Sequence, residues 1–174
     1  MCCGMIDHED RRRRNLKMEI FEGKTKATGK LHIELRGPDG ELKDERFVHN
    51  VVTNLGSKCV ATRLISAATD VMSHMAIGDD DDPAPAAADT ALNNEIHREI
   101  LTSSTQGTGA NDNDIVYIGD YAAGHGTNAA IVEAGIFNGA GVGTTTMLCR
   151  AKFAAINKGA SDTLKITWTV TLGT

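Results

Sequence analysis

The segment Thr163–Leu172, TLKITWTVTL, constrains the fold more than any other part of the chain, because it alternates strictly between apolar and polar residues. Its apolar positions are Leu164, Ile166, Trp168, Val170 and Leu172. Side chains of a β-strand alternate between the two faces of a sheet, so the segment is predicted to be a strand with one buried face. Trp168 is the only tryptophan and lies in the middle of the apolar face. We therefore predict that Trp168 anchors the centre of the core.

Alternating segments recur along the chain and are separated by turns rich in Gly, Asn and Asp. Lys30–Arg36 and the return strand Glu41–Val52 flank a Gly-Pro-Asp-Gly turn, which predicts a hairpin. Further strands are predicted at Met72–Gly78, Glu95–Thr102, Ile115–Asp120, Ala129–Phe137 and Thr145–Ala154. About eight or nine strands with regular turn signals are typical of an antiparallel β-sandwich, here expected to be jelly-roll-like.

One segment departs from the strand pattern and predicts the main helix of this all-β fold. In Asn54–Thr69 apolar residues recur at spacings of three and four, and Thr53 or Asn54 can cap the first turn. A single helical turn is expected within Ala86–Asn93, and a polar loop over residues 103–114. The length of 174 residues fits one domain, so residues 18–174 are expected to form a single sandwich.

Composition excludes some classes of function. The chain carries a net charge of −5, which argues against a protein that coats nucleic acid, and no specific nucleic acid is expected as a partner. No window holds the roughly 18 consecutive apolar residues of a membrane helix, so no membrane span is expected. The N-terminus has four arginines and no apolar stretch of the kind found in secretory signals.

Residues 1–17 are polar and contain a basic run, Arg11, Arg12, Arg13 and Arg14. We interpret this segment as a flexible arm that binds an acidic partner or nucleic acid through these four arginines. No aromatic residue interrupts the run, so stacking on nucleic-acid bases has no support. In an alternative interpretation, translation begins at Met18 and the arm is not part of the native product.

No motif predicts a catalytic centre, a cofactor site or a metal site. The four aspartates Asp79–Asp82 could hold a hard cation, but Pro83 interrupts the ligand spacing of a calcium loop, and a solvated acidic loop is favoured. The glycine-rich Gly139–Thr144 lacks the lysine of a phosphate-binding loop and is predicted to be a hairpin turn. Six histidines are scattered without zinc-helix spacing, and Ser73 beside His74 does not define a triad.

Several short segments of the chain resemble sequence motifs of one protein family. They are Met72–Gly78, Asp89–Leu92, Glu133–Asn138, Thr146–Arg150, Asn157–Ala160 and the C-terminal TLKITWTVTL. Together they resemble small structural proteins of tailed-bacteriophage virions, over roughly residues 45–174. The chain departs from that pattern at residues 1–17 and at Asp79–Asp82, where Gly and Thr are more usual.

The resemblance implies a non-enzymatic subunit of a virion that is assembled in the host cytoplasm. Capsid-decorating (cement) proteins of this size are often β-sandwiches or jelly rolls that form dimers or trimers. The expected partners are copies of the chain and the major capsid protein or other virion proteins.

Two other functions stay open. One is a tail-fibre or baseplate-associated adaptor, although the chain lacks the long repeat of a fibre shaft. The other is a carbohydrate-binding module, for which Trp168, Tyr117 and Tyr121 would be the candidate stacking residues.

Overall fold

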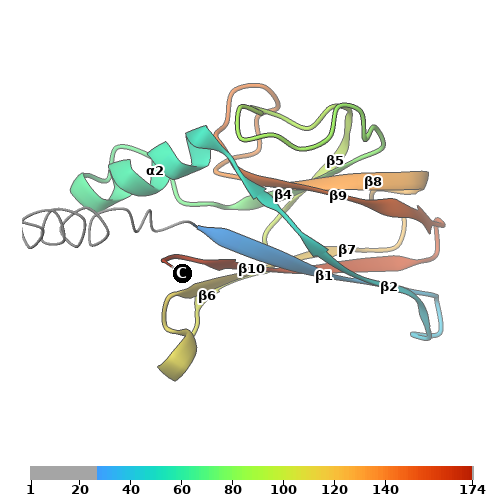
Figure 1. The fold of residues 1–174 in the computed structure, drawn as a ribbon. Helices are drawn as coiled ribbons and strands as arrows, with labels where there is room; N and C mark the ends of the chain where they lie inside the picture. Colours follow the sequence, from blue (N-terminus) through green and yellow to red (C-terminus); the bar gives the residue numbers. More distant parts are fainter. Residues whose placement is uncertain (1–26, 174) are drawn as a thin grey trace, which may run out of the picture.

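The computed structural model describes residues 27–173 and places them in two packed antiparallel β-sheets with one α-helix at one end (Figure 1). The first sheet contains, in spatial order, β2 (Leu42–His49), β1 (Thr28–Arg36), β10 (Thr163–Thr171), β7 (Asp114–Tyr121) and β6 (Ser103–Gln106). The second contains β3 (Val51–Val52), β9 (Met147–Lys158), β8 (Asn128–Phe137), β4 (His74–Gly78) and β5 (Glu95–Ile100). The helix is α2 (Asn54–Ile65).

This arrangement confirms the prediction of an all-β antiparallel sandwich with one main helix. The jelly-roll detail is not confirmed. Four pairs of consecutive strands lie side by side within a sheet, namely β1–β2, β4–β5, β6–β7 and β8–β9. Among the described residues, strands that are consecutive in sequence are therefore often adjacent in a sheet.

The core is organised around β10, which occupies the middle of the first sheet. Leu164, Ile166, Trp168 and Val170 each expose at most 1% of their surface. Trp168 is fully buried and lies opposite Leu31 of β1 and Tyr117 of β7. Its indole N–H has no hydrogen-bond partner among the described residues. The apolar face that the sequence predicts thus packs between the two sheets.

The segment predicted as one strand over Glu41–Val52 belongs to both sheets. β2 ends at His49, and after Asn50 the two residues of β3 pair with β9 in the second sheet. The adjacent apolar pair Val51–Val52 already broke the alternation in the sequence. A similar crossing joins β5 to β6, where Leu101 donates its N–H to Ser73 O in one layer and Thr102 donates to Ile118 O in the other.

The structure corrects several sequence-based boundaries. Residues 103–114 are not a plain loop, because they contain the edge strand β6 and a short 3-10 helix at Gly109–Asn111. The polar residues of β6 gave no apolar alternation from which a strand could be predicted. Ala86–Asn93 contains one hydrogen-bonded turn, in which the Asp89 N–H donates to Ala86 O, but no helix. Helix α2 ends four residues before Thr69, and β9 continues to Lys158.

Candidate functional site

Helix α2 is fixed to the second sheet at its N-terminus. Thr53 caps the helix by accepting a hydrogen bond from Gly56 N at 2.9 Å, and its hydroxyl donates to Met147 O at 2.6 Å. The Thr53 N–H also donates to Leu148 O at 3.0 Å. The capping residue thus joins the helix to β9, which explains why Thr53 is completely buried.

Gly56 allows the helix to approach the strand closely. A Cβ atom at this position would overlap with the backbone of Leu148, including its carbonyl oxygen. Backbone atoms of a central strand cannot move aside cheaply, so the glycine is required by packing and not by a special φ angle.

Replacing Gly56 by Ala is expected to displace α2 and to destabilise the fold by about 2–3 kcal/mol, in the range of core overpacking. Chemical denaturation followed by circular dichroism measures the change. The matched control is Ser57→Ala, on the next residue of the same helix, whose side chain is exposed. Equal stabilities for the two variants would show that α2 does not depend on this close contact.

An apolar groove of about 640 Å³ lies beside the helix, at the end of the sandwich where the two sheets open. We call it the α2 groove. Val60 and Leu64 line it from the helix, and Ile115 and Val170 line it from the first sheet. Ala27 and Gly173, the two ends of the described chain, also belong to its lining.

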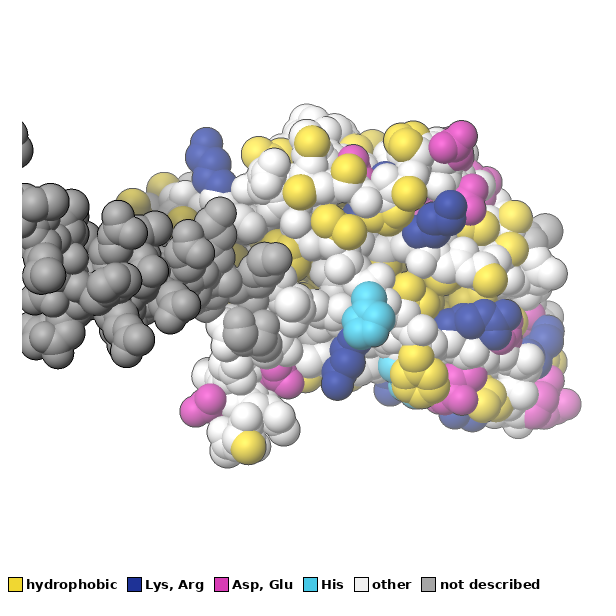
Figure 2. Space-filling view, in the orientation of Figure 1, with side chains coloured by type: hydrophobic (Ala, Val, Ile, Leu, Met, Phe, Trp, Pro, Cys, Tyr) yellow, Lys and Arg dark blue, Asp and Glu magenta, His cyan; other side chains and the backbone are white. Residues whose placement is uncertain are grey.

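Large apolar side chains remain exposed around this groove. Leu64 and Ile65 at the end of α2 expose 83% and 86% of their surface, and Val71 in the following loop exposes 59%. Most Lys, Arg, Asp and Glu side chains visible in Figure 2 lie toward the end of the molecule opposite α2.

Two residues with ionisable side chains, Tyr117 and Cys59, line the groove, and both are packed against the hydrophobic core. Burial raises the pKa of Tyr117 to about 12, with smaller contributions from Cys149 and Cys59. Cys59 is buried, and its Sγ lies 3.5 Å from Thr69 Oγ1. Thiolates are the reactive form of cysteine, so an apolar setting of this kind favours packing over catalysis.

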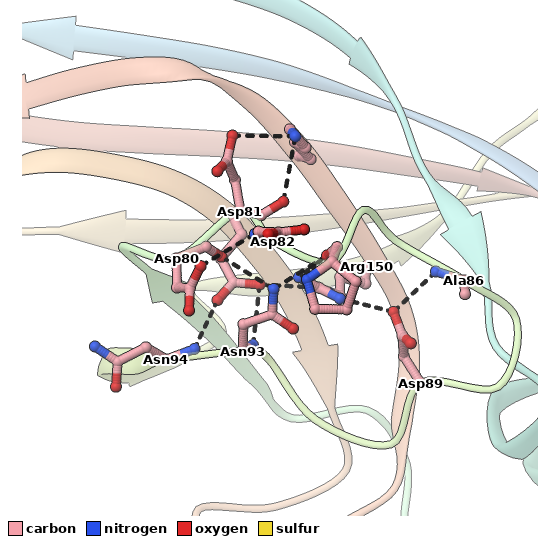
Figure 3. A network of polar contacts seen from close by, with 11 residues as sticks. Asp80, Asp81, Asp82, Ala86, Asp89, Asn93, Asn94 and Arg150 are labelled. Carbon is pink, nitrogen blue, oxygen red and sulfur yellow. Dashed lines mark hydrogen bonds and ion pairs between the residues drawn. The ribbon is translucent and has the colours of Figure 1, made fainter.

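The acidic loop after β4 is held in place by a buried ion pair (Figure 3). Arg150 of β9 donates from Nε to Glu133 Oε2 of β8 at 2.8 Å, and from Nη1 to Asp89 Oδ2 at 2.8 Å. Glu133 and Arg150 expose 0% and 1% of their side chains. The Glu133 carboxylate also accepts the backbone N–H groups of Asn93 and Asn94. Neither residue was predicted to be buried or paired.

The four aspartates Asp79–Asp82 do not converge on one point. Asp79 accepts hydrogen bonds from the side-chain amides of Asn94 and Asn128, and Asp80 accepts one from the N–H of Asp82. Asp81 pairs with Lys152 at 3.1 Å on the surface. Three of the four carboxylates are thus bound to other groups of the protein.

The structure brings together one group of metal-ligand side chains that sequence reasoning missed. His97 and Glu99 of β5 lie against His125, from the turn between β7 and β8, with their donor atoms within 4.8 Å of one another. The sequence places only His97 and Glu99 together, because they lie two residues apart in a strand. His125 is far away in sequence, so its approach could not be predicted.

The other residues singled out from sequence are not brought together. Arg11, Arg12, Arg13 and Arg14 lie outside the described residues. Ser73 Oγ lies 2.9 Å from His74 Nδ1, and burial lowers the pKa of His74, but no carboxylate completes a triad among the contacts of residues 27–173. The Gly139–Thr144 segment is a turn between β8 and β9.

The aromatic residues considered for sugar stacking are all buried. Trp168, Tyr121 and Tyr117 expose 0%, 1% and 6% of their surface, and the Tyr121 hydroxyl donates to Met75 O at 2.9 Å. None of the three therefore offers a ring face to a bound sugar.

No protein-family model, curated protein or solved structure matches this chain. Within residues 27–173, α2 is too short to reach across a bilayer, and no other α-helix is present there.

Proposed function

We propose that this chain is a non-enzymatic structural protein of a tailed-phage virion, a capsid-decorating (cement) subunit that assembles through the α2 groove. The observation that carries the proposal is the exposed apolar surface of Leu64 and Val71, which line an open apolar groove, together with exposed Ile65 next to Leu64 in sequence. Contiguous exposed apolar surface of this kind marks interaction sites in otherwise polar proteins. The family resemblance of residues 45–174 supports the virion as the setting.

The segment that we assign to the groove is residues 18–22, MEIFE, of a neighbouring copy. Its Met18, Ile20 and Phe21 match the apolar lining, and the segment precedes Ala27, which itself lines the groove. Phe21 is six residues from Ala27, so it can reach about 20 Å from the groove of its own copy. This distance is long enough for residues 18–22 of one copy to bind in the groove of an adjacent copy.

Charge favours the same arrangement. Residues 1–26 contain seven Lys and Arg against five Asp and Glu, whereas residues 27–174 contain 11 against 18. The basic arm with Arg11–Arg14 is thus attracted to the acidic body of another copy or of a shell protein. Such contacts steer association and weaken as salt rises.

The assembly is tested by sedimentation of the full chain and of three full-length variants. We expect a dimer or trimer for the unmodified protein, and a shift to monomer for Phe21→Asp and for Leu64→Asp, because each places a charge in the apolar contact. Phe47→Asp is the matched control, since Phe47 of β2 is 75% exposed and lies outside the α2 groove. A monomeric unmodified chain, or an oligomer that tolerates both groove variants, would overturn the assignment.

The virion setting is tested separately by labelling purified particles with an antibody against the chain. Signal over the head is expected for a cement subunit. Signal confined to the tail would replace the cement function by the tail-fibre or baseplate alternative. Absence of the chain from particles would reject both.

A further inference from the structure

His97, Glu99 and His125 form a cluster of three metal-ligand side chains whose donor atoms all lie within 4.8 Å of one another. His97 Nε2 lies 2.8 Å from Glu99 Oε1, and His125 Nδ1 lies 2.5 Å from the same oxygen. His97 and Glu99 are two residues apart in β5, so their side chains leave the same face of the strand. The third group comes from a turn more than twenty residues later.

The turn that carries His125 is fixed at several points. Lys158 Nζ donates to Ala122 O at 3.0 Å, and the N–H of Gly124 donates to Ala160 O at 2.7 Å. Gly124 and Gly126 adopt positive φ angles of 83° and 60°, which glycine tolerates better than other residues. A Cβ at Gly126 would also press on the side chains of Ile77 and His97. The local sequence thus positions the turn against β5.

His97 is positioned from its other side by an aromatic ring. The Tyr121 ring packs edge-on to the imidazole of His97, with ring centroids 6.1 Å apart. The Tyr121 hydroxyl is already bonded to Met75 O, so this residue supports the cluster and is not one of its ligands. Glu95 lies on the same strand but forms an ion pair with Arg98, so its carboxylate is not part of the cluster.

We propose that His97 Nε2, Glu99 Oε1 and His125 Nδ1 bind a divalent transition-metal ion of the zinc class. Two imidazoles and one carboxylate are a donor set that Zn²⁺ uses when it keeps a fourth position for water or another ligand. Metal–ligand bonds of about 2.0–2.2 Å place ligand atoms about 3.3 Å apart in a tetrahedral site, so each imidazole nitrogen has to move outward from its present 2.8 or 2.5 Å from Glu99 Oε1. His125 is 56% exposed between two glycines and can make that adjustment.

The site is tested with the full chain, stripped by a chelator and then titrated with zinc sulfate in a calorimeter. We expect one zinc ion per chain and a rise in melting temperature of about 5 °C at a hundredfold excess over the dissociation constant. His125→Ala and His97→Ala are each expected to weaken zinc binding at least about tenfold, a loss comparable to that caused by removing outer-shell partners. Circular dichroism checks that both variants remain folded.

The His32–Glu45 pair supplies a matched control. His32 Nε2 lies 2.7 Å from Glu45 Oε1 across β1 and β2, with no third ligand among residues 27–173, so Glu45→Gln is expected to leave zinc binding unchanged. Absorption spectra of the cobalt-loaded protein distinguish metal binding at this cluster from binding at Cys2, Cys3 and His8. Thiolate ligands give charge-transfer bands that nitrogen and oxygen ligands lack. Zinc binding that persists in His125→Ala, thiolate bands, or no binding at millimolar zinc would each overturn the proposal.

Discussion

Replacing Glu133 by Ala is expected to destabilise the protein by about 3–5 kcal/mol, the cost of leaving one member of a buried ion pair without its partner. The Glu133 carboxylate accepts hydrogen bonds from Arg150 and from the N–H groups of Asn93 and Asn94. For a chain of this length the melting temperature should fall by roughly 10 °C. Thermal and urea unfolding followed by circular dichroism measure the effect.

The acidic loop provides a second measurement for the same variant. Because Arg150 also binds Asp89 and Pro83 O, its reorientation should loosen the segment from Pro83 to Asn94, and the amides of Asn93 and Asn94 should exchange faster with deuterium.

Two further variants test whether burial of the ion pair causes the loss of stability in Glu133→Ala. Lys152→Ala removes an exposed ion pair that joins the same two elements, β9 and the acidic loop, through Asp81. This variant should change the free energy of unfolding by less than about 1 kcal/mol. The double variant Glu133→Leu with Arg150→Met removes both buried charges, and should recover part of the stability that Glu133→Ala loses. If the exposed pair costs as much as the buried one, burial is not the source of the effect.

Replacing Trp168 by Ala is expected to cost about 3–5 kcal/mol, because it leaves a cavity in a core that cannot collapse around it. Trp168 is fully buried between β1 and β7, opposite Leu31 and Tyr117. Urea unfolding followed by circular dichroism gives the change in the free energy of unfolding.

Comparison of Trp168→Phe with Trp168→Ala tests how much of the cost comes from packing. The indole N–H has no partner among the described residues, and a buried unpaired donor costs about 1–3 kcal/mol. Phenylalanine removes this donor and leaves a smaller void, so the loss should be clearly smaller than for alanine. Because both variants lack the N–H, equal losses would mean that the size of the void does not set the cost.

The sequence was sufficient to predict the elements whose faces alternate cleanly. β1 and β10 were predicted to within about two residues, because one face of each is buried and the other is exposed. β9 was predicted too short, since it is buried on both faces near Met147–Ala151 and ends in a polar stretch. β6 was missed because an edge strand of Ser, Thr and Gln buries no apolar face.

The candidate sites depend on contacts between distant residues, which local patterns do not reveal. Thr53 was correctly considered a helix cap from sequence, but its hydrogen bond to Met147 O joins residues 94 positions apart. The pairing of Glu133 with Arg150 and the approach of His125 to Glu99 depend on which strands are adjacent. Alternation predicts the faces of a strand but leaves its neighbours undetermined.

The pairing of β1 with β10 has a mechanical consequence for the particle subunit that we propose. Thr28 and Thr171 lie opposite each other in the β1–β10 ladder, so both ends of the described chain leave the sandwich at the same end. Tension applied to these two ends would break the ladder one pair at a time, as a zipper opens, and not in parallel. A subunit built this way withstands load better when the load enters through its sides than when it is pulled by its termini.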